Sequence, residues 1–417
     1  MFTFIHCADL HLDSPLRGLS ARPDAPQDQI RGATRRALSN LVDLCLRDPI
    51  DFLVIAGDVY DGDWQDYSTG LFFSASMARL QSAGIPVFLI RGNHDAASSI
   101  TRSLVLPSNV TEFSVRAPET HTIPELNVAL HGQGFAQRVV DQNLALAYPE
   151  ALPGFFNIGI LHTGLEGQEG HEPYAPCRLD DLLAKGYDYW ALGHIHKREV
   201  MHECPYVVYP GNLQGRHIRE TGAKGCTRVT VDGAAVRLEP VWLDVLRWVS
   251  CEVDLAGVED DLTFFSNVCS AIDRAAALHP GYPLAMRVVC YGETGLHGRL
   301  LQESERYTAE VVNAAGITVG DRLWIEKVKW TTTAPPQPVA DSGQTDAIHA
   351  LLETVDACGQ DQEWVNEFVR EVTKIQTRLG TQARDSGVAW LTGADDVAPL
   401  LDDARQLLIS LLQGGER

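Results

Sequence analysis

The chain has 417 residues, of which 45% are hydrophobic, and this allows two or three domains with real cores. Its net charge is −21, which argues against a protein that binds nucleic acid unaided, because contacts to phosphates need Lys and Arg. No apolar run approaches the roughly 20 residues that cross a bilayer, and the first residues lack the basic region of a secretory signal. The nine cysteines include no CxxC pair, which favours free thiols. We therefore expect a cytoplasmic protein with no membrane partner.

Five short apolar runs organise the first 200 residues, and each is followed by polar side chains. The runs are Phe2–Cys7, Phe52–Ala56, Val87–Ile90, Ile158–Leu161 and Tyr189–Leu192. Strands this short and this uniformly apolar suit a sheet that is covered on both faces. Ligands of open α/β sheets bind beyond the carboxyl ends of the strands. The polar fragments that follow the five runs are therefore expected to form one site.

These fragments supply carboxylate, amide and imidazole groups but no thiolate. Their metal-binding side chains are Asp9, His11, Asp58, Asn93, His162, His194 and His196. Such donors suit manganese, iron or zinc. Asp9 and His11 are two residues apart, and an extended backbone would place both on one face. Two divalent ions about 3.5–4 Å apart can activate a water and hold the oxygens of a phosphoryl group, and His94 could then serve the leaving oxygen as a general acid.

The ordered set DxH, GDxxD, GNHD, H and GHxH resembles the calcineurin-like metallophosphoesterase superfamily over roughly residues 1–230. The resemblance implies an α/β fold in which a sandwich of β-sheets is flanked by helices. It implies a first metal held by Asp9, His11, Asp58 and His196. It implies a second metal held by Asp58, Asn93, His162 and His194. His94 would be the catalytic histidine, and the neighbouring Asp95 would either orient it or be a capping or solvent-facing residue.

Helices and further strands are expected between these fragments. Residues 27–48 and 67–83 have the apolar spacing of helices that cover the sheet. Strands are expected at Asn127–Leu130, Cys204–Tyr209, Cys226–Val231 and Val236–Leu243. His131 follows the first of these strands, where it could approach the substrate or be structural.

Two loops near the metal-binding fragments carry further candidates. Asp61 follows Asp58 by three residues and could orient a ligand or be an ordinary turn residue. Residues 210–220 form a Gly-rich basic loop after the GHxH fragment. Within this loop Arg216, His217 and Arg219 could contact phosphate, or the loop could be an ordinary surface turn.

The stretches GDVYDGDW and PGNLQGRHIRETGAKG narrow the resemblance to the branch that holds the SbcD-type DNA-repair exonucleases, and within it to a YhaO-like subfamily. The resemblance implies manganese-dependent nucleases that work with an SMC-type ATPase. The chain departs from the SbcD-type pattern at Asp61, where that pattern commonly carries a histidine associated with exonuclease action on DNA ends.

After residue 243 the predicted pattern of strands and helices changes. Residues 244–333 alternate strand, helix, strand, helix and strand, which predicts a small α/β cap after the metallophosphoesterase domain of residues 1–243. In SbcD-type nucleases a cap of this kind flanks the active site, but it could also serve dimerisation or stability. A Pro- and Ser-containing linker is expected at 334–344, followed by a helical segment at 345–417. Its helices, at 345–357, 363–378 and 397–412, could bind the ATPase coiled coil, as the resemblance implies, or pack on their own chain.

Three functions remain open from the sequence. The first is a two-metal DNA nuclease, an exonuclease in the sense of the resemblance, with manganese as its metal. Its expected partners are DNA, an SMC-like coiled-coil ATPase and a second copy of the chain. The second is the same chemistry on a small diester such as a cyclic nucleotide, which the acidic net charge favours. The third is a scaffold that binds DNA ends or a partner without catalysis, against which the full ligand set argues.

Overall fold

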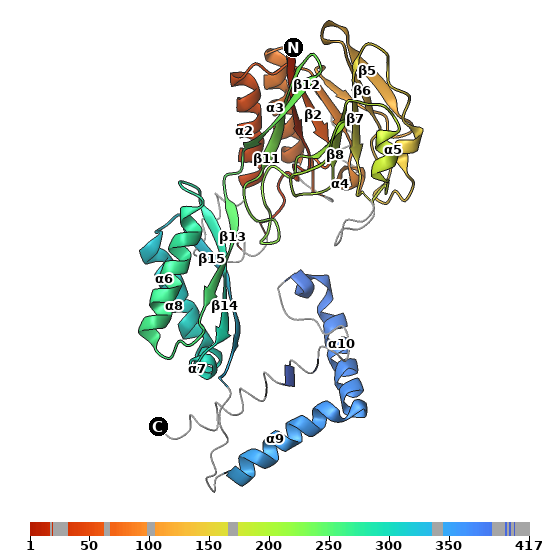
Figure 1. Ribbon diagram of the computed structural model, residues 1–417. Coiled ribbons are helices and arrows are strands. Elements are labelled where there is room, and N and C mark those ends of the chain that lie inside the picture. Colours follow the sequence, from red (N-terminus) through yellow and green to blue (C-terminus); the bar gives the residue numbers. More distant parts are fainter. Residues whose placement is uncertain are drawn as a thin grey trace. The chain divides into compact units, whose positions relative to one another are not determined.

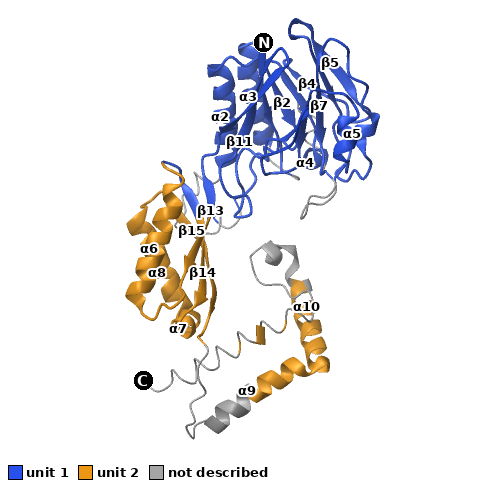
Figure 2. Cartoon of the chain, viewed as in Figure 1, with its two compact units in different colours: residues 1–249, 281–285 blue, residues 250–280, 286–417 orange. Residues whose placement is uncertain are grey.

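The computed structural model describes residues 1–16, 19, 32–61, 67–97, 105–165, 174–335, 345–385, 397, 400, 401 and 404. Two compact units divide the chain (Figure 2): residues 1–249 with 281–285, and residues 250–280 with 286–417. The sequence-based domain limits of 243, 333 and 344 stay predictions. Among the described residues, no helix is both long and apolar enough to span a membrane.

The first sheet of unit 1 has six strands in the order β12-β11-β1-β2-β3-β4. They are β1 (Phe2–Cys7), β2 (Phe52–Ala56), β3 (Val87–Ile90), β4 (Val110–Glu112), β11 (Gly225–Asp232) and β12 (Ala235–Trp242). Strands β1 to β4 are parallel, and β11 and β12 continue the sheet in antiparallel pairs. Helices α2 (Ala33–Arg47) and α3 (Tyr67–Ser82) cover one face (Figure 1), where Leu41, Phe73 and Met77 join the buried core.

The second sheet of unit 1 also has six strands, in the order β5-β6-β7-β8-β10-β9. They are β5 (Glu119–Ile123), β6 (Val128–Gly132), β7 (Phe156–His162), β8 (Tyr189–Gly193), β9 (Glu199–Glu203) and β10 (Tyr206–Tyr209). The four inner strands are parallel, and both edge strands are antiparallel. Short helices η2 (Leu144–Ala147) and α5 (Leu179–Leu183) contact the apolar cluster that includes Trp190 and Leu192.

Aromatic side chains join the two sheets. Phe4 stacks on Phe52 with ring centroids 4.9 Å apart and meets Tyr189 of the other sheet edge-on at 5.3 Å. The sandwich implied by the resemblance is thus confirmed. The five predicted strands all form, but they do not share one sheet: β1, β2 and β3 lie in the first and β7 and β8 in the second. Each is nevertheless apolar throughout, because the facing sheet covers one side and helices cover the other.

Unit 2 contains a three-stranded sheet in the order β13-β14-β15. Its elements are β13 (Arg247–Asp254), α6 (Asp261–Ala277), β14 (Leu284–Glu293), α7 (His297–Gln302), α8 (Ser304–Thr318) and β15 (Leu323–Thr333). The first residues of β13 and β14 belong to unit 1. The Asp260 carboxylate accepts hydrogen bonds from the Leu262 and Thr263 amides and caps α6. The predicted strand–helix alternation is confirmed, and α7 is an addition that its six residues were too few to reveal.

Two further helices, α9 (Thr345–Gln360) and α10 (Gln362–Asp385), follow in unit 2. Asp361 separates them, and its carboxylate accepts the amide hydrogens of Glu363 and Trp364 at the start of α10. Both helices were predicted, and α10 is longer than its apolar pattern indicated. The predicted helix at 397–412 and most of the predicted linker lie outside the described residues.

Gly159 in β7 permits a close approach that holds the second sheet together. A Cβ atom at this position would lie 2.4 Å from the fully buried ring of Trp190 in the neighbouring strand β8. We predict that Gly159→Ala lowers the free energy of unfolding of unit 1 by about 1–3 kcal/mol, because the indole has no room to move. Denaturant unfolding followed by tryptophan fluorescence measures this.

Gly316 in α8 provides the matched control. A Cβ atom there would have no heavy atom within 4 Å, so Gly316→Ala should stabilise the helix by about 0.5–1 kcal/mol. Equal effects of the two substitutions would show that contact with Trp190 does not determine the outcome.

Candidate metal centre

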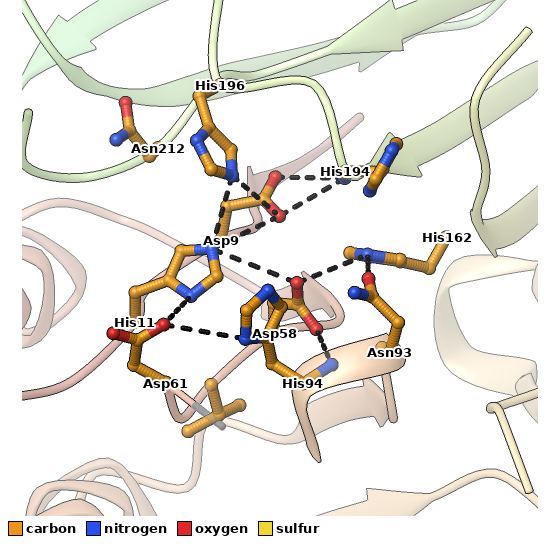
Figure 3. Close-up of polar contacts among 12 residues, drawn as sticks. Asp9, His11, Asp58, Asp61, Asn93, His94, His162, His194, His196 and Asn212 are labelled. Atoms are coloured by element: carbon orange, nitrogen blue, oxygen red, sulfur yellow. Dashed lines mark hydrogen bonds and ion pairs between the residues drawn. The ribbon is translucent and has the colours of Figure 1, made fainter. Parts of the chain in front are cut away.

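The polar side chains at the strand ends converge on one place (Figure 3). Asp9 and His11 follow β1, Asp58 follows β2, and Asn93 and His94 begin the short helix α4 (Asn93–Ala97) after β3. The second sheet contributes His162 at the end of β7, and His194 and His196 after β8. The site therefore lies where the carboxyl ends of parallel strands from both sheets meet.

Four of these residues have left-handed backbone conformations. Their φ angles are 52° at Asp9, 41° at His11, 53° at Asp58 and 98° at His194. The extended backbone expected for Asp9 and His11 is thus wrong, although their side chains do come together. Backbone hydrogen bonds from Asp9 to Gly57 and from His11 to Asp58 hold these turns. Such strained conformations are typical of functional sites, where the surrounding structure maintains them.

Two glycines of the motifs permit the loops to approach each other. A Cβ atom on Gly92 would lie 2.2 Å from Asp58 Oδ1, and one on Gly193 would lie 2.0 Å from the Ala56 carbonyl oxygen. The glycines of GNHD and GHxH are therefore needed because neighbouring loops occupy the space of a side chain.

Asp9, His11 and His196 form the first group of candidate metal ligands. The Nε2 atoms of His11 and His196 face each other at 3.1 Å. Asp9 Oδ1 lies 3.7 Å from His196 Nε2 and 4.0 Å from His11 Nε2. Asp58 Oδ2 lies 3.8 Å from His11 Nε2, so this carboxylate also borders the group.

Asp58 and His162 belong to a second group, together with Asp9, and Asn93 lies beside them. His162 Nε2 lies 2.9 Å from Asn93 Oδ1 and 3.4 Å from Asp58 Oδ2. The ring of His194 lies beside that of His162, with centroids 5.3 Å apart. The structure thus brings six of the seven side chains that the sequence indicated as ligands into these two groups, with Asp58 between them, and places the His194 ring beside His162.

The chemistry of these atoms fits divalent cations. His162 Nδ1 lies 2.9 Å from the Ala56 carbonyl oxygen and must donate to it, while Nε2 faces two oxygens without hydrogens, so either a proton or a cation must lie between them. Glu220 Oε1 lies 2.7 Å from His196 Nδ1 and assigns the hydrogen to that atom in the same way. Lone pairs that face other electron-pair donors in a buried site are stabilised by a cation between them.

The acid–base properties of the site agree with this arrangement. Burial lowers the pKa of His162, but the negative charge of Asp58 outweighs this and raises it to about 9. Without a metal, a proton on Nε2 therefore takes the position that a cation would occupy. Burial, aided by the positive charge of Arg216, lowers the pKa of His11 to about 3, so that this ligand is neutral as metal binding requires. Burial opposes the charge of Asp58, but the nearby histidines hold its pKa well below the usual range.

The structure gives Asp95 a different role from the expected orientation of His94. Its buried carboxylate accepts three backbone hydrogen bonds, from the amides of Val59, Tyr60 and Gly92. Asp95 therefore joins the loop after β2 to the start of α4, which agrees with the capping alternative. Asp61 is the carboxylate beside His94, with Oδ1 3.4 Å from His94 Nδ1.

The structure places the four candidate substrate-binding residues in different environments. His131 is wrong as a substrate contact, because it is fully buried and both ring nitrogens have partners, in Thr120 and Asn157. Arg216 and His217 lie beside the metal-binding residues and are partly buried, whereas Arg219 is exposed.

Sequence reasoning missed Glu220. This buried carboxylate bonds to His196 at 2.7 Å and to Arg216 at 3.1 Å. The sequence does place an acidic residue at the end of the basic loop. However, Glu220 and His196 are 24 positions apart, so no local pattern indicates that they are in contact.

Comparison with known proteins now supplies independent information. Residues 2–198 match the family model of the calcineurin-like phosphoesterases, and residues 248–333 match that of the middle domain of metallophosphoesterase YhaO. The chain is 36% identical over 294 residues to the uncharacterized metallophosphoesterase YhaO of Bacillus subtilis, and the match covers 70% of this chain and 72% of that protein. The chain belongs to the calcineurin-like metallophosphoesterase family, in its YhaO group.

More distant relatives of this metallophosphoesterase are DNA double-strand break repair proteins Mre11. That of Sulfurisphaera tokodaii is 24% identical over 261 residues, which covers 58% of this chain and 63% of the relative. That of Methanopyrus kandleri is 26% identical over 231 residues, covering 50% and 48% respectively. Among solved structures, a dimetal phosphatase from Danio rerio is 13% identical and covers 56% of this chain and 93% of that one, with a TM-score of 0.36.

Membership of this family makes the protein a metal-dependent phosphodiesterase of the hydrolase class, as the motifs predicted. The family binds two divalent metals, and the two groups around Asp58 are the described residues that would hold them.

The structural role of Asp95 can be separated from the catalytic role proposed for His94. We predict that Asp95→Asn lowers the free energy of unfolding by about 1–3 kcal/mol, because an amide has one acceptor oxygen for three amide hydrogens. His94→Ala should leave stability unchanged and lower kcat by about 10²–10⁴, since His94 is partly exposed beside the site. Thermal unfolding and steady-state kinetics on one diester measure both. An Asp95→Asn protein of normal stability and reduced kcat would contradict this assignment.

Proposed function

We propose that this metallophosphoesterase is a manganese-dependent DNA nuclease that acts as a subunit of a DNA-repair complex. The observation that carries the proposal is a full set of two-metal ligands in a chain whose relatives include DNA double-strand break repair proteins Mre11. Carboxylate, amide oxygen and imidazole donors without thiolate favour manganese, although iron and zinc accept the same donors.

The residues have distinct parts in the proposed reaction. When bound, two divalent ions activate a water and neutralise charge on the phosphodiester. Asp58 separates the two ligand groups, and its Oδ1 accepts the backbone amide hydrogen of His94 at 2.9 Å, which fixes the position of that residue. The His94 ring is partly exposed and edges onto the His11 ring, with centroids 4.9 Å apart. From there it donates a proton to, or stabilises charge on, the leaving oxygen.

A small diester is the second candidate substrate, and the net charge of −21 favours it. A long DNA backbone would be repelled by such a chain unless a basic partner supplied compensating charge. A DNA substrate therefore goes together with a partner subunit in this proposal.

Helix α10 supports the proposed contact with an SMC-like coiled-coil ATPase. Trp364, Phe368, Val372 and Ile375 are spaced by four, four and three residues, so they form one apolar stripe. Among the described residues, Ile375 at the end of this stripe is 59% exposed. Such a stripe suits packing against another helix pair.

A second copy of the chain is a further proposed partner. On α3, Tyr67 and Leu71 lie one turn apart and are 59% and 61% exposed. A pair of large apolar side chains in this position suits a contact between two copies. Light scattering on the wild-type chain and on Leu71→Asp tests it, with a single-chain mass for the wild type as the outcome that excludes a stable dimer.

The first experiment compares the wild-type protein with Asp58→Asn on end-labelled linear DNA, with manganese, and runs a generic aryl phosphodiester in parallel. We expect manganese-dependent DNA cleavage by the wild type and a loss of at least about 10³-fold in the variant, because Asp58 serves both ligand groups.

Cleavage of the aryl diester alone, even with the partner ATPase present, would favour the small-substrate candidate. No cleavage of either substrate despite bound manganese would favour the scaffold. The length of the labelled products distinguishes an exonuclease, which shortens the DNA from an end, from an endonuclease, which cuts within it.

The partner contact is tested on the same protein. We predict that a coiled-coil ATPase encoded beside this chain copurifies with it, and that Ile375→Asp weakens this association by at least about tenfold, because a charge replaces an apolar contact. Lys374→Asp, on the adjacent exposed position, is the control. Equal retention of the ATPase by wild type and Ile375→Asp would exclude α10 as the contact.

A further inference from the structure

Arg216 lies between two carboxylates that each serve a histidine of the metal centre. Its Nη2 atom donates to Glu220 Oε1 at 3.1 Å, and its Nη1 atom donates to Asp61 Oδ1 at 3.4 Å. The side chain is only 13% exposed. Arg219, three residues later on the same loop, is exposed.

Glu220 fixes the ring of His196. Its Oε1 atom lies 2.7 Å from His196 Nδ1, while its Oε2 atom accepts the Arg216 amide at 2.7 Å and the Asn212 side-chain amide at 2.8 Å. All these bonds are short, and the carboxylate is 6% exposed. Arg216 Nη2 also lies 3.1 Å from His196 Nδ1, but the shorter contact of that nitrogen is with the Glu220 carboxylate. Because a carboxylate can only accept, Glu220 favours the hydrogen on His196 Nδ1, and Nε2 then presents a lone pair to the metal centre.

Asp61 has the corresponding position behind His11. Its Oδ1 atom lies 3.5 Å from His11 Nδ1 and 3.4 Å from His94 Nδ1, so one oxygen faces two imidazoles (Figure 3). The same oxygen lies 3.4 Å from Arg216 Nη1. These contacts are long for hydrogen bonds, and they act mainly through charge. A negative charge behind His11 favours the hydrogen on Nδ1 and the lone pair on Nε2.

His11 and His196 need carboxylates behind their rings because their Nε2 atoms lie close together. Their Nε2 atoms are 3.1 Å apart, and two lone pairs at that distance repel each other in the absence of a cation. Each ring would gain by rotating away or by moving its hydrogen to Nε2. A carboxylate behind each ring opposes both changes before the metal arrives.

We propose that Asp61, Arg216 and Glu220 form a clamp (the Arg216 clamp) that preorganises His11 and His196 for the first metal, and that Arg216 is a positioning residue and not a phosphate contact. Arg216 joins the two carboxylates and keeps them from repelling each other. The proposal rests on the metal centre and not on DNA as the substrate, so an enzyme that acted on small diesters would have the same clamp.

The direction in which Arg216→Ala changes the metal affinity distinguishes this proposal from a purely electrostatic effect of the arginine. Removal of a positive charge near a cation site should tighten metal binding, because the repulsion between the two is lost. Loss of the clamp should weaken it, because His11 and His196 are no longer oriented. Arg216→Ala and Arg219→Ala remove the same charge from the same loop, but only the first breaks the clamp.

The experiment titrates metal-free full-length protein with Mn²⁺ and follows free Mn²⁺ by electron paramagnetic resonance. We expect the wild type to bind two ions and Arg216→Ala to bind one of them about 10- to 100-fold more weakly, as is usual when a partner of a metal-bound histidine is lost. Arg219→Ala should bind both ions at least as tightly as the wild type. Glu220→Gln should resemble Arg216→Ala, and Arg216→Lys should lie between, since an ammonium lacks the fork that joins two carboxylates.

Two further measurements keep a folding defect apart from loss of the clamp. Thermal unfolding of each metal-free variant reports its stability, and variants that unfold below the assay temperature are replaced by Arg216→Lys. Histidine ¹⁵N NMR of the metal-free protein reports the tautomers, and the Nδ1–H form of two histidines should decline in Glu220→Gln and Arg216→Ala.

The proposal is overturned if Arg216→Ala binds both Mn²⁺ ions as tightly as the wild type and instead raises KM, because Arg216 would then be a substrate contact. It is also overturned if Arg219→Ala weakens Mn²⁺ binding as much as Arg216→Ala. Failure of the protein to cleave DNA would affect neither result, because metal binding is measured without substrate.

Discussion

The Asp58 carboxylate joins the two halves of unit 1. Its Oδ2 atom lies 3.8 Å from His11, which follows a strand of the first sheet, and 3.4 Å from His162 at the end of a strand of the second, so the site forms only when the two sheets are packed together. A buried carboxylate is stable only with compensating charge, and here His162 supplies part of it. A cation between the ligands would supply the rest. Loop geometry, glycine positions and the capping by Asp95 all maintain Asp58 in this place.

The backbone around the site is strained because the ligands come from separate loops. Left-handed conformations at Asp9, His11 and Asp58 turn side chains toward the joint between the sheets, where an ordinary extended strand would direct them into one core or the other. The missing side chains of Gly92 and Gly193 leave room for Asp58 and for the Ala56 carbonyl. Function in this family member therefore requires tight packing as well as ligands.

The charge of the chain and the geometry of the site make different demands on a substrate. The site is suited to a phosphodiester in general, since two divalent ions held by its residues would act on the phosphoryl group alone. Much of the basic charge near it is engaged, because Arg216 is shared between Asp61 and Glu220. Recognition of a long anionic polymer would then fall largely to a partner, which links the choice of substrate to the assembly of a complex.

The sequence by itself determined the strands, the ligand types and their order, because apolar runs and the polar residues after them are local properties. It could not assign β1 and β7 to different sheets, since both are buried on two faces and look alike. Short elements such as β4, β9 and α7 were missed because three to six residues carry no clear period. Only the tertiary structure decided that Asp61 lies beside His94 and that Glu220 lies behind His196, because these contacts join residues 24 or more positions apart. Hydrogen bonding between distant loops leaves no pattern along the chain.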